Sequence, residues 1–404
     1  EQSEWTDMER RYIVVVGACL TQFTVIGMLF SFGLLFKTFE AEFGWSRMVL
    51  STCSALAFLT MGILAIAAGR LSDRYGPKWV LGISGALFGF GFGLISLVSQ
   101  PWHLFVIFSV FIGLGMSTHD VVTLSTIARW FEGRRGIMSG VVKVGTAFGQ
   151  IVLPPLSAFL IVSLGWRPAV ALLGVLAFVL LVAAALAMKT PDLKQTPETV
   201  QDASGLTFQQ ARKTSLFWRL CIIQFLFFPT LMTVPVHLAA HGMDLGMTAG
   251  RAALLLSVLG SASILGRLVM GGGADRFGGK NAYILSFVLL LASLVGLVAT
   301  TAHLPLFLIV ALYGVTHGGF FTLVSPVVAE YFGMRAHGSI FGTILFCGTL
   351  GGSVGPILAG RVFDLTGSYQ PSFISLGLLA LIGLVLAFYL PYPKAATTGK
   401  LGAE

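Results

Sequence analysis

Charged residues are scarce in this sequence. Asp, Glu, Lys and Arg make up only 10% of the 404 residues, whereas 56% are hydrophobic and the mean hydropathy is +0.89. This balance excludes an ordinary soluble domain and is typical of a protein that crosses a membrane many times. The 49 glycines fit that class, because small residues let helices approach closely where lipid removes the hydrophobic drive for association.

Cysteines are few, and the common enzyme motifs are absent. The sequence contains no Walker loop, no HExxH and no GxSxG, so we expect neither an enzyme nor transport driven by ATP hydrolysis, and no cofactor. Four cysteines lie within apolar runs and never as CxxC, which predicts small core residues rather than a disulfide framework or a metal site. They are Cys19, Cys53, Cys221 and Cys347.

The net charge of +8 does not indicate a nucleic-acid partner, because the basic residues are spread over short loops. Most of the 25 Lys and Arg residues lie on the side of the predicted spans that holds both termini, which predicts cytoplasmic termini. The first apolar run is as long as its successors, so we expect a membrane span and not a cleaved signal peptide. The expected location is the inner (cell) membrane of a bacterium, as a monomer in the lipid bilayer.

Apolar runs bounded by charge, glycine or proline predict twelve transmembrane helices. The polar stretch 189–214 divides them, and we expect residues 1–188 and 215–404 to form two six-helix halves joined by a cytoplasmic linker. The fold class predicted is an all-α membrane protein with two pseudo-symmetric halves. The expected spans are 12–37, 48–69, 79–99, 103–128, 136–163, 167–188, 215–240, 250–272, 281–300, 304–329, 338–362 and 371–391.

Two short motifs occur once in each half. GRLSDRYGPK (69–78) follows the second span and GGGADRFGGK (271–280) follows the eighth; ARWFEGRRG (128–136) and AEYFGMRAHG (329–338) follow the fourth and tenth. The corresponding motifs of the two halves lie on the same side of the membrane. This indicates parallel repeats, with a substrate site near the midplane between them. We interpret the two DR motifs as charged turns.

Three charged residues lie inside the predicted spans at similar depth. Arg267 precedes Asp275 by eight residues, Asp120 precedes Arg129 by nine, and Lys143 follows Arg135 by eight, which places all three roughly 12 to 14 Å from one surface. An intramembrane charge is expensive and predicts a functional site.

These motifs, with the glycine-rich stretches GTAFGQIVLPPL and GTLGGSVGPILAG, resemble the major facilitator superfamily over essentially the whole chain. Within it, FGLLFKTFEAEFGWSR (32–47), RWFEGRRG (129–136) and LGWRPAVALLG (164–174) are similar to the monocarboxylate transporter branch, which includes bacterial lactate carriers and oxalate:formate exchangers. The resemblance implies the major facilitator fold and marks Arg267 as the residue that binds a carboxylate.

The chain departs from that branch at three places. Phe30 stands about where some animal members carry a lysine, and the eleventh span lacks the lysine of the oxalate exchangers. Ser263 occupies the position one turn before Arg267, so a mechanism that pairs an acid with the arginine in this helix does not carry over.

Arg267 is suited to bind a carboxylate because its planar guanidinium can donate two parallel hydrogen bonds to the two carboxylate oxygens. Lys143 has two interpretations: a second anion contact, or the partner of Asp120 on a neighbouring helix. Release of Lys143 to an anion would let Asp120 take a proton, so Asp120 is the candidate for proton coupling. Its neighbour His119 is a second candidate, with a packed, neutral ring as the alternative.

Further candidates surround this layer. His317 lies one turn after Tyr313 and one turn before Phe320, and Phe346 belongs to the eleventh span; we assign all four to the substrate cavity. His237 lies near the outer end of the seventh span, where Pro229 and Pro235 would kink the helix, and is a candidate for an outer gate. For an inner gate that breaks as the halves rock, the candidates are Asp73, Arg74, Asp275 and Arg276.

The function predicted is secondary active transport of a small organic anion, a monocarboxylate first, by alternating access with proton symport or anion exchange. A dicarboxylate or oxalate-type exchanger that uses Lys143 and Arg267 together is the alternative within transport. A channel or a membrane receptor is the alternative from another class, and drug efflux is disfavoured by two cations in the cavity.

Overall fold

The computed structural model describes residues 2–32, 35–45, 47–190, 205–247 and 249–392. Among them, twelve helical segments are long and apolar enough to cross a membrane, which confirms the predicted fold class. The first half contains α1 (Gln2–Phe32), α2 (Leu35–Phe43), α3 (Arg47–Tyr75), α4 (Pro77–Leu94), η1 (Ile95–Leu97), α5 (Pro101–Val106), η2 (Ile107–Ile112), α6 (Gly113–Met116), α7 (Val121–Trp130), η3 (Glu132–Arg134), α8 (Arg135–Leu164) and α9 (Trp166–Ala187). The second contains α10 (Phe208–Ala211), α11 (Ser215–Asp244), α12 (Ala249–Phe277), α13 (Gly279–Ala299), α14 (His303–Phe332), α15 (His337–Thr366) and α16 (Gln370–Phe388).

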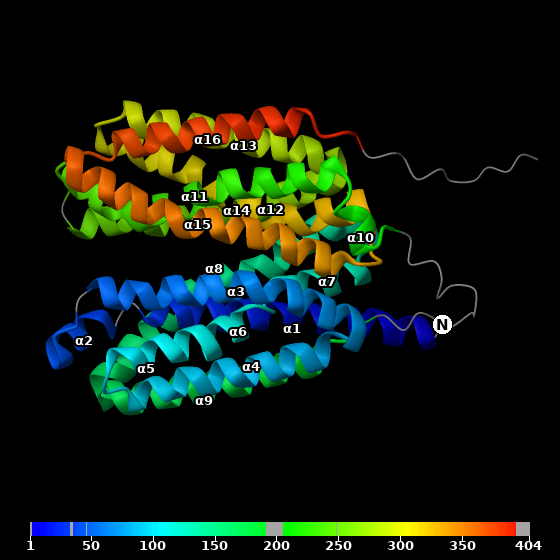
Figure 1. Ribbon diagram of the computed structural model, residues 1–404, viewed down its shortest axis with the longest axis horizontal. Coiled ribbons are helices and arrows are strands. Elements are labelled where there is room, and N and C mark those ends of the chain that lie inside the picture. Colours follow the sequence, from blue (N-terminus) through cyan, green and yellow to red (C-terminus); the bar gives the residue numbers. More distant parts are fainter. Residues whose placement is uncertain (1, 33–34, 46, 191–204, 248, 393–404) are drawn as a thin grey trace, which may run out of the picture.

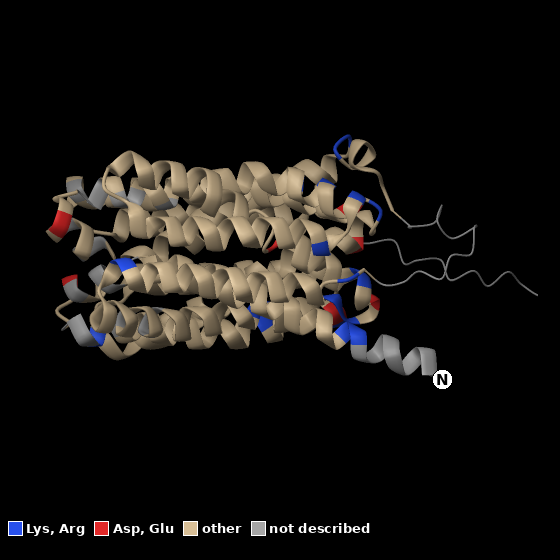
Figure 2. Ribbon diagram, turned by 90° about the horizontal axis from the view of Figure 1, so that it is seen from below, with Lys and Arg blue, Asp and Glu red and all other residues tan. Residues whose placement is uncertain are grey.

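The helices form two bundles that lie side by side with their axes nearly parallel (Figure 1). Helix α1 begins and α16 ends at the same end of the molecule, which we call the terminal end; α3, α7, α12 and α14 also finish there. Figure 2 shows that most Lys and Arg residues gather at this end. The asymmetry agrees with the loop charges in the sequence, which follow even-numbered spans.

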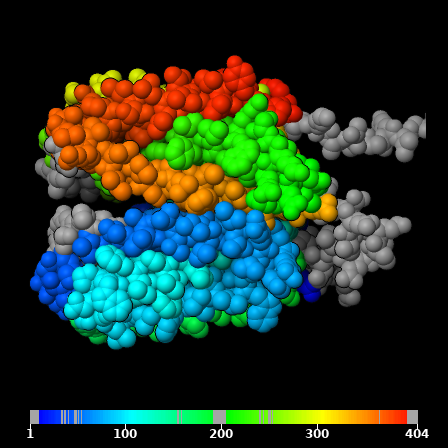
Figure 3. Space-filling model, in the orientation of Figure 1, coloured from blue at the N-terminus to red at the C-terminus, as the bar shows by residue number. Residues whose placement is uncertain are grey.

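The two halves meet along two helix pairs, α3 with α15 and α8 with α12. Figure 3 shows α3 and α15 in contact along the seam of one face. Glycines make the close approach possible: a Cβ on Gly69 would collide with the backbone of Gly338, and one on Gly136 with the backbone of Gly271. Small residues at helix crossings are the usual way in which membrane helices bring their backbones together.

The two DR motifs, interpreted as charged turns, are helical almost to their ends. Helix α3 runs through Asp73 and Arg74 to Tyr75, and α12 runs to Phe277. Only Gly76 (φ 84°) and Gly278 (φ 82°) break the chain, because glycine adopts positive φ without steric cost. Pro77 then begins α4, where its missing N–H costs nothing. The motif charges are therefore held rigidly in a last helical turn.

The fourth span is not the continuous helix expected over 103–128. It passes from α5 through a π-helical stretch (η2) into the short α6, and residues 117–120 form a turn before α7 begins at Val121. The Ser117, Thr118 and His119 side chains in this stretch hydrogen-bond to backbone carbonyls three residues earlier and compete with the helix. Breaks of this kind occur frequently at functional sites.

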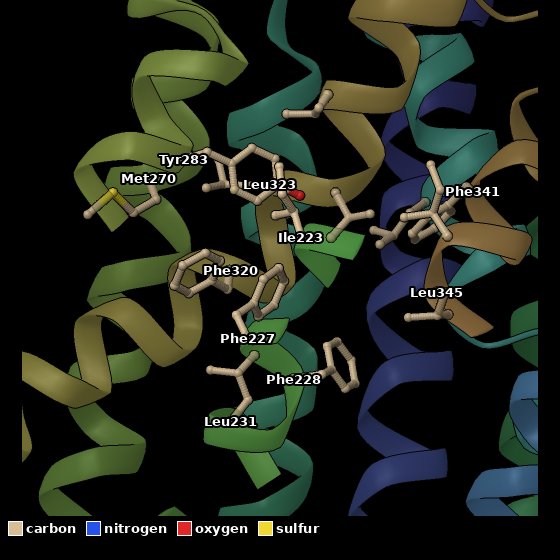
Figure 4. Packing of buried hydrophobic residues seen from close by; sticks show 14 of the residues in the cluster. Ile223, Phe227, Phe228, Leu231, Met270, Tyr283, Phe320, Leu323, Phe341 and Leu345 are labelled. Carbon is tan, nitrogen blue, oxygen red and sulfur yellow. The ribbon is translucent and has the colours of Figure 1, made fainter. Parts of the chain in front are cut away.

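Aromatic residues fill the interior of the second half (Figure 4). The rings of Phe227 on α11 and Phe320 on α14 stack with centroids 4.2 Å apart. Tyr283 on α13 packs against both rings, so this cluster ties three helices together. Aromatic pairs at such separations stabilise a core beyond the area that they bury.

Part of the expected linker 189–214 lies outside the described residues, namely 191–204. Near its end, Thr207 caps α10 with a reciprocal pair of hydrogen bonds to Gln210. The Leu206 N–H donates to the Phe332 carbonyl at 2.8 Å, and the Arg70 guanidinium lies 4.9 Å from the Phe208 ring. The linker therefore contacts both halves at the terminal end.

Candidate functional site

The break in the fourth span places Asp120 at mid-helix depth with its carboxylate turned away from its own backbone. Asp120 is the residue that precedes α7, yet its side chain does not cap that helix. It forms an ion pair with Lys143 on α8 through Oδ1. Both side chains are buried, with relative exposures of 7% for Asp120 and 3% for Lys143. Of the two interpretations of Lys143, this conformation shows the pair with Asp120.

Gln22 on α1 completes the surroundings of Asp120. Its Nε2 donates to Asp120 Oδ1 at 2.8 Å and to the His119 carbonyl at 2.9 Å. Its Oε1 accepts a hydrogen bond from the Thr146 hydroxyl at 3.0 Å. Sequence reasoning did not select Gln22; a lone amide in the apolar run of the first span was the available signal.

His119 bends back onto its own segment. Its Nδ1 lies 2.5 Å from the Met116 carbonyl, and its Nε2 lies 3.5 Å from Asp120 Oδ1. The carbonyl accepts, so Nδ1 carries a proton in this arrangement. The ring is 4% exposed, and it links the break to the carboxylate.

No carboxylate of the described residues forms an ion pair with Arg267. Arg267 is 2% exposed, and within the described residues the only hydrogen bond of its guanidinium goes from NH1 to the Ser263 hydroxyl at 3.0 Å. None of the described residues provides a hydrogen-bond partner for its buried Nε. A buried donor without an acceptor is costly, so these N–H groups are able to donate to an anion.

Arg267 lies at the seam between the halves. A Cβ on Gly140 of α8 would collide with the Arg267 carbonyl, so the two helices touch at this level. Lys143 lies three residues after Gly140 on α8, about one helical turn away, so the cations of the two halves lie at neighbouring levels. The structure therefore brings together the three charges that the sequence placed at one depth.

Phe321 connects Lys143 to the second half. The Lys143 ammonium lies 5.4 Å from the centroid of the Phe321 ring, and the His317 ring lies 5.2 Å from the same ring. Within the described parts of the chain, the buried His317 Nδ1 has no hydrogen-bond partner. A second polar atom without a described partner thus lies on α14, across the seam from Lys143.

The other proposed cavity residues lie in different surroundings. The Tyr313 hydroxyl donates to the Thr230 carbonyl at 2.8 Å, and Phe320 belongs to the aromatic core of Figure 4. Phe346 lies at the α3–α15 seam, 3.1 Å from the position that a Cβ on Gly62 would occupy. Among these, Phe346 lies between the halves, whereas Tyr313 and Phe320 pack within the second half.

Two carboxylates of the DR motifs cross the seam at the terminal end. Asp275 of α12 accepts hydrogen bonds from the Gly136 and Ile137 N–H groups at 2.7 and 2.8 Å, at the first turn of α8. Asp73 of α3 accepts from the Ser339 N–H at 3.3 Å, in the first turn of α15. A carboxylate at a helix N-terminus satisfies orphan N–H groups and interacts favourably with the helix dipole.

The arginines of the same motifs behave differently. Arg74 and Arg276 lie over the rings of the residues that follow them, Tyr75 and Phe277. Asp73 is instead paired with Arg129 of α7, at 2.6 Å. Sequence reasoning did not select Arg129, because an arginine near a helix end is normally solvated.

His337 was also missed, although it joins the halves. Its Nε2 lies 2.9 Å from the Ser325 carbonyl on α14, and its Nδ1 lies 2.9 Å from the Ser125 hydroxyl on α7. The carbonyl can only accept, so Nε2 carries the proton and the Ser125 hydroxyl donates to Nδ1. The side chain is fully buried. Nothing in a glycine-flanked His suggested burial.

His237 lies at the end opposite to the terminal end. Its Nε2 is 3.0 Å from the Pro356 carbonyl and its Nδ1 is 3.3 Å from the Tyr369 hydroxyl. Both partners belong to the second half. The contacts described for His237 hold α11 against α15 and the start of α16.

Known structures share this architecture. The chain matches the fucose:proton symporter FucP of E. coli with a TM-score of 0.73 and 15% identity, over 95% of this chain and 99% of that one. It matches the proton:xylose symporter XylE with a TM-score of 0.70 and 17% identity, over 95% and 96%. The fold is therefore that of a membrane transporter built from two six-helix halves.

The family follows from the sequence match. Residues 18–302 and 238–404 match the model of the Major Facilitator Superfamily, and the chain belongs to this superfamily of transporters. Monocarboxylate transporter 13 of Rattus norvegicus is 28% identical over 94% of this chain and 89% of that protein. Monocarboxylate transporter 11 of Homo sapiens is 28% identical over 95% and 83%. These relatives confirm the resemblance to the monocarboxylate transporter branch.

The buried pair leads to a prediction about stability. Lys143→Met leaves the Asp120 carboxylate buried without its cation, and breaking a buried pair from one side costs ~3–5 kcal/mol. Lys143→Met combined with Asp120→Asn removes both charges, so its thermal midpoint in detergent should recover most of the loss. Additive losses in the double variant would show that the two side chains do not act as a pair.

Proposed function

We propose that this transporter carries small organic anions, monocarboxylates foremost, by alternating access between its two halves. The observation that carries the proposal is the charge balance of the buried layer. Asp120 and Lys143 neutralise each other, whereas Arg267 has no acid beside it in its own helix and keeps unused N–H donors. One carboxylate completes this layer, because the guanidinium binds it through two parallel hydrogen bonds.

The same balance favours one negative charge on the substrate. A second carboxylate would need Lys143, which is held by Asp120 in this conformation. In the first binding step, while this pair is intact, a dicarboxylate therefore finds a partner for only one of its carboxylates, whereas a monocarboxylate is fully paired by Arg267. The similarity to proteins named monocarboxylate transporters supports the same substrate class.

Occlusion of the charges supports alternating access. Arg267 and Lys143 are 2% and 3% exposed, so a substrate reaches them only after the halves move apart. The layer lies where α8 and α12 touch, which is where a rocking motion of one half against the other opens and closes the path.

The basic terminal end supports an orientation with both termini in the cytoplasm, following the positive-inside rule (Figure 2). In a bacterium the corresponding location is the inner membrane. The carboxylates Asp73 and Asp275 then close the cytoplasmic side, and their release opens it.

Replacing Arg267 tests the substrate site. Arg267→Gln should reduce uptake of a monocarboxylate into proteoliposomes by roughly 100-fold, because truncating one partner of a buried charged contact costs about 2–5 kcal/mol. Thermal stabilisation by monocarboxylates, stronger than that by dicarboxylates in the unaltered protein, should disappear too. Arg276→Gln on the same helix is the control. Uptake that survives Arg267→Gln in a folded protein contradicts the proposal.

Proton coupling through Asp120 is the proposed driving step. After the substrate carboxylate has bound to Arg267, Lys143 turns from Asp120 to the same carboxylate, and Asp120 takes a proton that moves with the substrate. Asp120→Asn cannot bind that proton, so it should lose uphill uptake driven by a pH gradient while retaining exchange of labelled for unlabelled substrate. Uphill uptake by this variant would show that the proton travels elsewhere.

The proposed gate is tested by the accessibility of a cysteine at the terminal end to a labelling reagent. Ile340, fully buried in α15 beside Ser339, serves as a reporter when changed to Cys in a background without the four native cysteines. Asp73→Asn with Asp275→Asn removes two charged helix caps, each worth ~0.5–2 kcal/mol. A membrane-impermeant maleimide should then label inside-out vesicles about tenfold faster.

Arg74→Gln is the comparison, because the Arg74 guanidinium lies over Tyr75 of its own helix. It should leave the labelling rate nearly unchanged. Equal rates for the two carboxylate substitutions and the unaltered reporter would refute the gate. Labelling from the opposite face of the membrane alone would refute the orientation.

A further inference from the structure

We infer that Gln22 is the positioning residue of the Asp120 site: it holds the carboxylate in place when Lys143 leaves for a substrate. The inference deepens the proposed function and rests on it. Gln22 does not touch the substrate in this scheme. It acts through Asp120, from a helix that contributes neither of the paired charges.

The contacts of Gln22 fix its orientation. On one side its amide faces Asp120 Oδ1 and the His119 carbonyl, both of which can only accept a hydrogen bond. The nitrogen must therefore lie on that side, where it also reaches the Thr123 hydroxyl at 3.2 Å. The oxygen then faces Thr146 of α8, whose hydroxyl donates to it at 3.0 Å. The side chain is fully buried, so no water competes for these bonds.

The two oxygens of Asp120 differ. Lys143 and Gln22 both bind Oδ1, and His119 Nε2 lies nearest the same atom. No hydrogen bond to Oδ2 is made by the described residues, and the Asp120 side chain keeps 10% exposure. Oδ1 is therefore the anchored oxygen, and Oδ2 is the one on which a proton can arrive.

Glutamine suits position 22 because its side chain is uncharged. A second cation on Oδ1 would compete for the substrate carboxylate, whereas an apolar side chain would leave Lys143 as the only strong donor to Asp120. Departure of Lys143 would then strand a buried carboxylate, which is costly unless it becomes protonated. With Gln22 in place, one donor remains on Oδ1 throughout.

The other charged or titratable groups near Asp120 come from three elements. They are His119 in the break, Lys143 on α8 and Arg267 on α12. None of them is altered by a substitution at Gln22, so a change in pH dependence reports on the amide contact itself.

Gln22→Met keeps the length of the side chain and removes both hydrogen-bonding groups. Lys143 is then held more tightly by Asp120 at neutral and alkaline pH, so the KM for a monocarboxylate should rise about tenfold there, equivalent to ~1.4 kcal/mol. At acidic pH, Asp120 can take a proton on Oδ2, and KM should return to nearly the unaltered value. The measurement is KM and kcat for substrate exchange in proteoliposomes as a function of pH.

A double-mutant cycle separates positioning from general damage. In the Asp120→Asn background no carboxylate needs anchoring, so Gln22→Met should have almost no further effect on KM. Thr24→Val is the control on the same helix: Thr24 is fully buried, and its hydroxyl donates to the Leu20 carbonyl one turn away. It should leave KM unchanged at every pH.

If Gln22→Met fails to fold, Thr146→Val provides the second variant. It removes the donor that orients the amide and leaves Asp120 untouched, and it should shift KM in the same pH-dependent direction by a smaller factor. A pH-independent loss of kcat in either variant, or an effect that persists in the Asp120→Asn background, overturns the inference. Uptake that survives Arg267→Gln overturns the proposed function instead, so the two failures are distinguishable.

Discussion

The buried ion pair between Asp120 and Lys143 is the interaction on which the site depends. Charge in the middle of a membrane protein costs several kcal/mol per ion unless it is paired and hydrogen-bonded. Pairing within the first half leaves Arg267 of the second half as the cation with unused donors. An anion is the complement that we propose for this arrangement, at the place where the two halves meet.

The same two helices that hold the cations also form the seam. Gly140 of α8 lies against the Arg267 carbonyl of α12, and Asp275 of α12 caps the first turn of α8. A movement that separates these helices at the terminal end must also change the surroundings of Lys143 and Arg267. In the proposed mechanism, binding and gating share this contact, so a ligand with different affinities for the two states shifts their populations.

The break in the fourth span gives this site its chemistry. An unbroken helix would use the backbone carbonyls near Asp120 internally, whereas the turn at 117–120 leaves the His119 carbonyl to accept from Gln22. One amide thus joins α1, the break and, through Thr146, α8. Closely satisfied polar networks of this kind fix a single geometry inside an apolar bundle.

The sequence by itself determined the class, the spans and the charge layer. Apolar runs near the thickness of a bilayer leave few alternatives to a helix, and a charge such as Arg267 is conspicuous in such a run. The repeated DR motifs further predicted two related halves. These signals are local, so they can be read without knowing which helices touch.

Only the tertiary structure decided which partners those residues have. The sequence left Lys143 between substrate and Asp120, and packing of α8 against the broken span brought it to Asp120. Gln22 carries no distinctive local pattern, and the repeated motifs that contain Arg129 and His337 do not reveal their partners. In each case a helix distant in the chain supplies the partner. Helix contacts within lipid depend on where small residues and hydrogen-bonding groups of separate helices coincide, which no single segment reveals.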